Sequence, residues 1–528
     1  MPWKNFCNPL LKADFPDPDV IRVGDTYYMV STTMHFMPGC IILRSYNLSD
    51  WEILTHVYEI LEDTDKERLA GKEHAYGQGM WAASLRYHKG IFYICFVAND
   101  TGKTYLYRSE NIMGPWKRNL LEGFYHDNSL LFDDDGRVYI AYGNKKIYVT
   151  ELNKELTGPK PGGLHKLVVQ DPGQVRLGYE GTHFYKINGK YYLFFIHWKE
   201  EENARRSQAC YVSEHIAGEY RGGEVLDDDR GYLNQGVAQG GIVDTPRGEW
   251  YGILFQDSGA VGRIPVLVPV TFQKDFPVFG VEGKVPNEIK VYDARPDYKY
   301  EPIWGDDDFS YEADEAGNYH LHQRWEWNHI PDNRYWKIER EKKALCLTTD
   351  RICENVTRAI NTLTQRLMYP GSEVSVTVNG EKLGVGDIAG ICMLQGDYGL
   401  VGMKREKDGY YAIMLVRPAE TENAMESPAD LTVGKEIARM KLPGASVEIG
   451  VRTEFENGKD TAQFALKIDG EWKNFGQSMK LYFKLDHFCG CRAGLFCYST
   501  EKTGGTAEFT KFRHRRTTLG GRNLTKLD

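Results

Sequence analysis

The stretch Gly189-Lys190-Tyr191-Tyr192-Leu193-Phe194 places a turn, an aromatic pair and an apolar run in a fixed order. The same order of a turn, an aromatic or β-branched residue, a tyrosine and an apolar run occurs in four other places. Short apolar runs bounded by Gly, Asn and Asp turns are typical of β-strands, and long amphipathic helical patterns are hard to find. The other copies occupy residues 25–30, 90–95, 136–141 and 248–253.

The spacing of these copies predicts the fold of the N-terminal half. Successive copies lie roughly 45 to 65 residues apart, the length of a four-stranded propeller blade with its loops. We therefore expect a five-bladed β-propeller over residues 1–295. Five unrelated hairpins in a sandwich would use the same turn residues, but here the match between copies also extends upstream of the turns.

The upstream match puts polar and aromatic side chains at equivalent positions of the blades. They lie nine residues before the turn glycine in copies two to five, and eight before the turn in the shorter first copy. Equivalent positions of successive blades surround one axis, so we expect the five side chains to ring one end of the central channel. A buried core would not tolerate such carboxylates unpaired. The five residues are Asp17, Trp81, Asp127, Glu180 and Gln239.

The pattern changes beyond Pro269. Residues 276–296 are rich in Pro and Gly and are typical of a connector. Runs at 374–378 and 411–415 then alternate or cluster as strands. The sequence thus predicts an all-β chain in which a jelly-roll-type β-sandwich over residues 296–528 follows the propeller. A length of 528 residues also favours two domains.

Composition excludes several classes of partner. A net charge of −9 without a basic stretch argues against nucleic acid. Residues 1–6 lack the apolar run of a signal peptide, and no segment is long and apolar enough for a membrane span. The ten cysteines are scattered, and the lone pair Cys489 and Cys491 lacks the second pair that a zinc site needs. We therefore expect reduced cysteines, a cytoplasmic location, and no membrane or nucleic-acid partner.

Three carboxylates around one cavity suggest two kinds of chemistry. Hard cations take several carboxylate oxygens. Hydrolysis of a glycosidic bond uses one protonated and one ionised carboxyl group. Trp81 favours the sugar, because an indole stacks on the apolar face of a sugar ring, whereas Gln239 could bind a sugar hydroxyl or a metal-bound water.

Six segments of the chain together match one known family. With these segments the sequence resembles family 43 of the glycoside hydrolases over nearly its whole length. The C-terminal half resembles the sandwich domain of the family's β-xylosidases and α-L-arabinofuranosidases. The matching segments are Asn8-Pro9-Leu10-Leu11, Phe15-Pro16-Asp17-Pro18-Asp19, Met80-Trp81-Ala82, residues 126–136 from His126-Asp127-Asn128, Glu180-Gly181-Thr182-His183 and Gly262-Arg263-Ile264-Pro265.

The resemblance implies a role for each carboxylate. Asp17 corresponds to the general base that deprotonates the attacking water, and Glu180 to the general acid that protonates the leaving oxygen. Asp127 corresponds to the third carboxylate, which raises the pKa of the acid and orients it. Family members invert the anomeric configuration, so base and acid should stand far enough apart to admit water. Trp81 and Arg263 correspond to residues that line the pocket of the terminal sugar.

Four further substrate contacts are expected at Gln239, His35, Phe36 and His183. His183 either contacts substrate or is a hydrogen-bonded structural histidine, and His35 and Phe36 either border the pocket or cap the first blade. Many family members carry a histidine in place of Gln239, and that histidine often coordinates a central calcium or its water shell. We therefore assign no metal ligand and expect no required cofactor, with calcium left open.

Two acidic runs have simple interpretations. Residues 133–135 resemble half of a calcium loop but are typical of a hairpin turn. Residues 306–308 are expected to form a solvated linker, with a bound cation as the alternative.

The predicted activity is that of an exo-acting glycosidase. It would release terminal or branching α-L-arabinofuranose, or β-D-xylose, from arabinoxylan-derived oligosaccharides, with a slight preference for the arabinofuranosidase. A β-D-xylosidase acting on xylo-oligosaccharides is the alternative. A non-catalytic carbohydrate-binding protein would have lost at least one ring carboxylate, and all three are present. The expected partner is a small oligosaccharide, and a homo-oligomer is left open.

Overall fold

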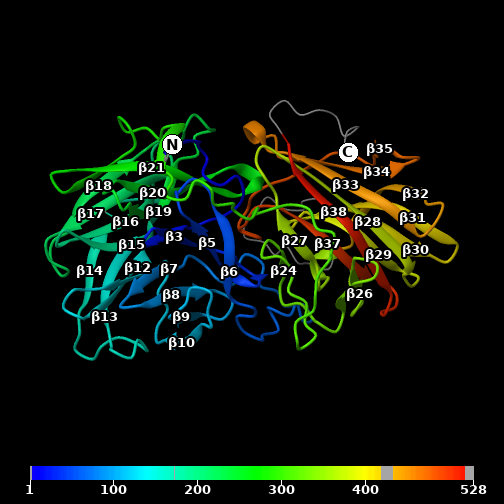
Figure 1. Ribbon diagram of the computed structural model, residues 1–528, viewed down its shortest axis with the longest axis horizontal. Helices are drawn as coiled ribbons and strands as arrows, with labels where there is room; N and C mark the ends of the chain where they lie inside the picture. Colours follow the sequence, from blue (N-terminus) through cyan, green and yellow to red (C-terminus); the bar gives the residue numbers. More distant parts are fainter. Residues whose placement is uncertain (1–2, 172, 418–431, 518–528) are drawn as a thin grey trace.

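A computed structural model describes residues 3–171, 173–417 and 432–517 of the chain. Figure 1 shows two lobes side by side, with the N-terminal half in blue to green and the C-terminal half in yellow to red. The described regular structure is almost entirely β-strand. The short 3-10 helices are Gly259–Val261, Val356–Arg358 and Glu456–Gly458.

The N-terminal lobe consists of five four-stranded antiparallel sheets, which are the blades of a propeller. The five-bladed propeller predicted from the repeat is confirmed. The short pair of β1 (Trp3–Cys7) and β23 (Glu288–Tyr292) joins the two ends of this lobe. The blades are β2 (Asp19–Val23), β3 (Thr26–Ser31), β5 (Gly39–Ser45) and β6 (Glu52–Tyr58); β7 (Ser84–His88), β8 (Ile91–Ala98), β9 (Lys103–Ser109) and β10 (Lys117–Leu121); β11 (Ser129–Phe132), β12 (Val138–Asn144), β13 (Lys146–Leu152) and β14 (His165–Gln170); β15 (Val175–Ile187), β16 (Lys190–Lys199), β17 (Ser207–Ser213) and β18 (Arg221–Leu226); β19 (Val237–Asp244), β20 (Trp250–Asp257), β21 (Arg263–Gln273) and β22 (Phe276–Phe279).

The apolar strands are explained by the packing between blades. Successive side chains of a strand point to opposite faces, and in a propeller both faces of a blade meet a neighbouring blade. In β8, Ile94 and Phe96 join the cluster shared with blade one, whereas Tyr93 and Cys95 join the cluster shared with blade three. Full burial of such a side chain contributes about 1.5–3 kcal/mol, so every junction stabilises the ring.

The C-terminal lobe is a sandwich of two large antiparallel sheets around one apolar cluster. In β28, Val374, Val376 and Val378 face this core and alternate with partly exposed residues. The first sheet contains β24 (Glu326–Asn328), β27 (Leu363–Arg366), β29 (Asp387–Leu394), β30 (Gly399–Glu406), β31 (Gly409–Val416), β32 (Lys435–Lys441) and β37 (Arg492–Ser499); the second contains β25 (Trp336–Glu339), β26 (Ala344–Thr348), β28 (Ser372–Lys382), β33 (Ser446–Glu454), β34 (Thr461–Ile468), β35 (Glu471–Asn474), β36 (Met479–Lys480) and β38 (Thr506–Arg516).

The two lobes share a sheet. The propeller strand β4 (Phe36–Met37) pairs with β24 at the edge of the first sandwich sheet. The Arg492 guanidinium carbon lies 3.5 Å from the centroid of the Phe36 ring, and Arg492 also pairs with the buried Glu326. Arg366 Nε of the sandwich donates to the Asp14 carbonyl of the propeller at 2.8 Å, and together with the shared sheet this contact holds the lobes together. The expected boundary at 295/296 falls between β23 and β24.

Two further expectations concern the cysteines and the membrane. All ten cysteines lie in the described residues, and none is paired in a disulfide. Nine of them are buried, as expected for reduced core residues, and Cys7 is exposed. Among the described residues, no helix is long and apolar enough to cross a membrane.

Candidate active site

Three of the five residues predicted to ring the channel share an unusual backbone conformation. Asp17, Asp127 and Gln239 have φ of 53°, 48° and 56°, in the left-handed region that few residues other than glycine adopt. Glu180 lies in β15, next to Gly181 with φ of 62°. Left-handed backbone at a non-glycine residue costs of the order of 1–3 kcal/mol and persists only where the surroundings hold it. Blades one, three and five thus hold the same strained conformation at equivalent positions.

Asp17 is buried and held by three side chains. Its Oδ1 accepts hydrogen bonds from Gln239 Nε2 at 3.0 Å and from Arg263 Nη1 at 2.9 Å. Its Oδ2 accepts a hydrogen bond from Thr32 Oγ1 at 2.6 Å. Burial raises the pKa of Asp17, and the Arg263 guanidinium and the Thr32 hydroxyl oppose that rise. The carboxylate is therefore fixed in one orientation and is more basic than an exposed aspartate.

Asp127 and Glu180 lie together on blades three and four. The Gly181 N–H donates to Asp127 Oδ2 at 2.8 Å, so Asp127 holds the backbone beside Glu180. Asn144 Nδ2 donates to Glu180 Oε2. Burial raises the pKa of Asp127, and the neighbouring Glu180 reinforces this rise while the His126 imidazole opposes it.

His126 is a member of this site that the blade-counting argument missed. Its Nε2 lies 3.5 Å from Glu180 Oε2 and 3.7 Å from Asp127 Oδ2. The negative charge of Asp127 raises the pKa of His126 to about 9, against the opposing effect of burial, and the hydrogen bond to Glu180 adds to the rise. The ring is therefore an imidazolium at neutral pH. The sequence could have pointed to His126, because this residue directly precedes Asp127. No such feature of the sequence points to Asn144, which lies on β12.

Both lobes build the wall of the site. Phe488 comes from the loop between β36 and β37 of the sandwich, and its ring lies 5.4 Å from that of Trp81. Arg263 stacks on Phe488, with its guanidinium carbon 4.6 Å from the ring centroid, and its Nη2 donates to the Phe488 carbonyl at 3.2 Å. Gly77 (φ 67°) lets this loop approach, because a Cβ there would stand 2.6 Å from the Leu485 carbonyl oxygen.

The three remaining predicted contacts are buried. His183 Nδ1 lies 3.0 Å from Asp19 Oδ1. The His35 ring packs against the His329 ring at 4.7 Å, and Phe36 lies in the strand that joins the lobes. These positions favour the structural alternative for all three residues, and their contact with substrate stays a prediction.

The types of ligand atom in this site determine which metal ions suit it. Ligand atoms of His126, Asp127 and Glu180 lie within 4.8 Å of one another. A set containing imidazole suits transition metals better than calcium, and a protonated His126 opposes binding at neutral pH. In residues 306–308, each aspartate accepts a hydrogen bond from, or pairs with, a sandwich side chain. The described residues therefore add no ligand set suited to calcium to the sequence analysis, which assigned no metal ligand and left calcium open.

Comparison with known families accounts for this geometry. The model of the glycosyl hydrolases family 43 matches residues 6–277, which include the three carboxylates, Trp81, Gln239 and Arg263. The chain belongs to glycoside hydrolase family 43. A second model, the β-xylosidase C-terminal concanavalin A-like domain, matches residues 314–515. The predicted family, the hydrolase class and the propeller-plus-sandwich fold are confirmed.

Several relatives resemble this family 43 hydrolase along most of its length. A β-xylosidase from Formosa agariphila is 26% identical, covering 96% of the chain and 90% of the relative. A non-reducing end α-L-arabinofuranosidase from Bacteroides ovatus is 26% identical, covering 65% of each. A solved bifunctional GH43-CE protein from Bacteroides eggerthii is 38% identical with a TM-score of 0.88. The match covers 98% of this chain. It covers only 64% of the Bacteroides eggerthii protein.

Proposed function

We propose that this hydrolase is an exo-acting, inverting glycosidase that removes terminal or branching pentose units from arabinoxylan-derived oligosaccharides. The observation that carries the proposal is the convergence of Asp17, Asp127 and Glu180 from three blades on one site, where Trp81 contacts His126. Hydrolysis of a glycosidic bond requires carboxyl groups in different protonation states. The three carboxyl groups have different hydrogen-bond partners, and this difference supports different protonation states among them.

Each carboxyl group has a distinct role in the proposed reaction. Asp17 removes a proton from a water molecule, whose oxygen attacks the anomeric carbon on the face opposite the leaving group. Glu180 gives its proton to the departing glycosidic oxygen, so the bond breaks without releasing an alkoxide. Asp127 orients the acid through the Gly181 N–H next to Glu180.

The sandwich loop supports attack at chain ends rather than within chains. Phe488 and Arg263 close one side of the site, and Trp81 stands next to them. A pocket walled from both lobes accommodates a terminal sugar, whereas an endo-acting enzyme needs an open cleft. Arg263, with its fixed fork of donors, is suited to bind the hydroxyls of that sugar.

The leading sugar is α-L-arabinofuranose, and β-D-xylose is the second candidate. Their hydroxyl arrangements are similar enough for one pocket to bind either. The two curated relatives described above carry names of both activities, so their similarity supports a pentosidase without favouring one sugar.

The test compares hydrolysis of 4-nitrophenyl α-L-arabinofuranoside and 4-nitrophenyl β-D-xylopyranoside. We expect the wild type to cleave at least one, and Glu180→Ala to lose about 10²–10⁴-fold of the activity. The exposed loop carboxylate Glu201 provides the control, and Glu201→Ala should retain full activity. The rate ratio identifies the sugar, and NMR of the first product tests inversion. Failure to cleave either substrate, or an unimpaired Glu180→Ala, contradicts the proposal.

A further inference from the structure

We propose a second, non-catalytic sugar-binding pocket at the junction of blades five and one, on the propeller face opposite the catalytic residues. The catalytic aspartates precede the first strands of their blades. This cavity is lined instead by the turns that follow those strands, at Asp25 between β2 and β3 and at Arg247 between β19 and β20. The strands therefore separate the two sites.

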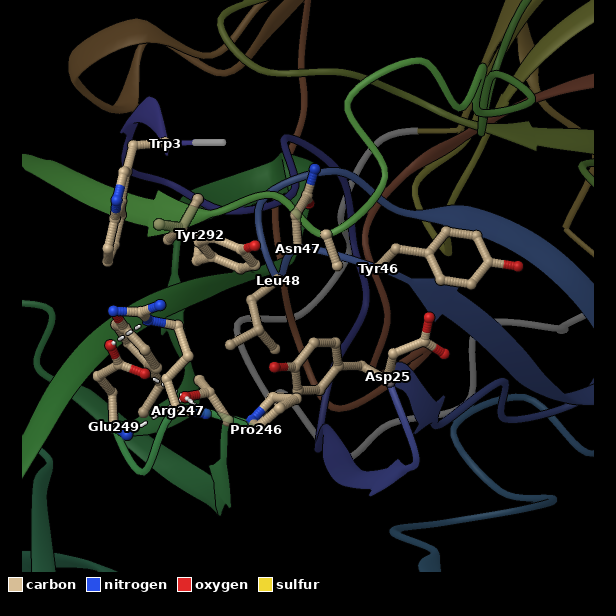
Figure 2. Close-up of a pocket in the computed structure, with 14 residues that line it drawn as sticks. Trp3, Asp25, Tyr46, Asn47, Leu48, Pro246, Arg247, Glu249 and Tyr292 are labelled. Carbon is tan, nitrogen blue, oxygen red and sulfur yellow. Dashed lines mark hydrogen bonds and ion pairs between the residues drawn. The ribbon is translucent and has the colours of Figure 1, made fainter. Parts of the chain in front are cut away.

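The cavity has the size and lining of a site for a single ring. Its volume is about 150 Å³, below the roughly 300–1,000 Å³ of pockets for larger ligands. Figure 2 shows Trp3 and Tyr292 on one side, with Arg247 and Glu249 close to them. The rings of Trp3 and Tyr292 meet edge to face at 5.6 Å, and both residues are more than a third exposed. A ligand could thus reach these aromatic surfaces from solvent.

Three of the four other blade junctions are packed by aromatic pairs. At these junctions a ring from one blade packs on a ring of the next. In the described part of the chain, no ring pair joins blade five to blade one, although Tyr251 and Tyr27 stand at that junction. The packed pairs are Tyr28–Phe92, Tyr93–Phe132 and Tyr192–Phe272, with centroid separations of 5.7, 4.5 and 5.9 Å.

Two tyrosine hydroxyls at this cavity have no hydrogen-bond partner among the described residues. Tyr27 is 4% exposed and Tyr251 is 9% exposed, and both line the cavity. Neither hydroxyl bonds to another described residue, and neither is sealed from solvent. By contrast, the Tyr191 hydroxyl at the junction of blades three and four donates to Asp133 Oδ2 at 2.7 Å. A hydroxyl that meets only solvent can bond to a ligand without breaking a hydrogen bond within the protein.

The remaining polar groups define the class of ligand. Arg247 lies over both exposed rings, with its guanidinium carbon 5.2 Å from the Trp3 ring and 5.1 Å from the Tyr292 ring. Its Nε donates to Glu249 Oε1 at 3.3 Å, and Asp25 of the lining pairs with Arg295 at 2.8 Å, so each charge in the lining has an opposite charge beside it. Aromatic faces, two hydroxyls and a neutralised ion pair fit a neutral ring with several hydroxyls. Given the proposed function, we identify this ring as one pentose unit of an arabinoxylan chain.

The test measures binding of soluble arabinoxylan separately from catalysis. Migration in native gels containing arabinoxylan is compared for two proteins. The first is Glu180→Gln, which lacks the proposed acid and so should degrade the polymer about 10²–10⁴-fold more slowly than the wild type. The second carries Tyr27→Phe and Tyr251→Phe in addition. These substitutions remove only the two hydroxyls. Because each hydrogen bond contributes about 0.5–1.5 kcal/mol, we expect retardation to weaken about tenfold. In the active enzyme, the same pair of substitutions should leave kcat/KM for the 4-nitrophenyl glycosides unchanged.

A matched pair provides the control. Tyr93→Phe with Tyr139→Phe changes the tyrosine of the same repeat in blades two and three, away from the cavity, and should leave retardation unchanged. The inference is overturned if arabinoxylan does not retard Glu180→Gln, if the pocket pair changes nothing, or if both pairs weaken retardation equally. A parallel loss of kcat/KM in the pocket pair also overturns it. If the proposed function is wrong, the wild type will cleave neither glycoside, and this result is distinct from any outcome of the binding test.

Discussion

The two ends of the propeller strands differ in how their polar groups are satisfied. At the catalytic end, both oxygens of Asp17 accept hydrogen bonds, from three residues on two blades. At the turn end between blades five and one, the hydroxyls of Tyr27 and Tyr251 bond to no described residue. At the catalytic end, the protein itself supplies the hydrogen bonds before substrate binds. At the turn end, two hydroxyls remain available for hydrogen bonds to a ligand.

This difference has an energetic basis. A catalytic group must be held in its reactive orientation, which here takes left-handed backbone at Asp17 and Asp127 and burial of both carboxyl groups. At the turn end, Tyr27 and Tyr251 lie in the regular strands β3 and β20, and the left-handed backbone is at Leu48 of the lining, with φ of 65°. Substitutions at the catalytic end should therefore change rates and pH dependence, whereas substitutions at the turn end should change affinity alone.

The largest effect among the remaining predictions concerns the sandwich. Phe488→Ala removes the ring that packs on Arg263 and Trp81. Losing an apolar wall worth about 1.5–3 kcal/mol should lower kcat/KM for the 4-nitrophenyl glycosides on the order of tenfold to a hundredfold, chiefly through KM. The catalytic end would then depend on both lobes.

The same loop supplies the control for this substitution. Leu485 is 44% exposed, and Leu485→Ala should leave both kinetic constants unchanged. A Phe488→Ala enzyme with wild-type kcat/KM would show that the propeller completes the catalytic end alone.

The sequence predicted those parts of the site that the blade repeat controls. Each blade turns with the same geometry, so counting from the turn glycine located Asp17, Asp127 and Glu180 without knowledge of the loops. Phe488 could not be found in this way, because its place beside Arg263 depends on how the sandwich docks, 225 residues farther along the chain.

The same limit applies within the propeller and to the second pocket. Asn144 reaches Glu180 from the end of β12, through a side-chain direction that no periodicity specifies. The cavity at blades five and one arises where β1 and β23 join the ends of the ring, so a repeat common to all blades could not predict it.

A smaller effect tests the hydrogen bonds at Asp17. Thr32→Val removes the donor 2.6 Å from Asp17 Oδ2 and keeps the shape of the side chain. The pKa of Asp17, already raised by burial, should rise further, because this hydroxyl stabilises the ionised form. The base acts only when ionised, so the acid limb of kcat/KM should move to higher pH by about one unit. Thr26→Val, which removes a hydroxyl that donates to Asp25 at the turn end, should leave the pH profile in place.

The smallest expected effect concerns His126 and appears as a stability difference that changes with pH. The neighbouring Asp127 raises the pKa of His126 to about 9, so the folded protein holds this proton more tightly than the unfolded chain, where histidine titrates near about 6.5. The stabilisation should be fully present below that lower value and should be lost as the pH rises through about 9. We expect the wild type to exceed His126→Gln by about 2–4 °C in Tm at mildly acidic pH, and the difference to vanish at alkaline pH. His320, exposed and 3.0 Å from Asp314 Oδ2, is the matched control, and His320→Gln should change Tm little at any pH. A difference at His126 that stays constant with pH would mean that the ring contributes by packing, and that the charges of Asp127 and Glu180 at the catalytic end are balanced without it.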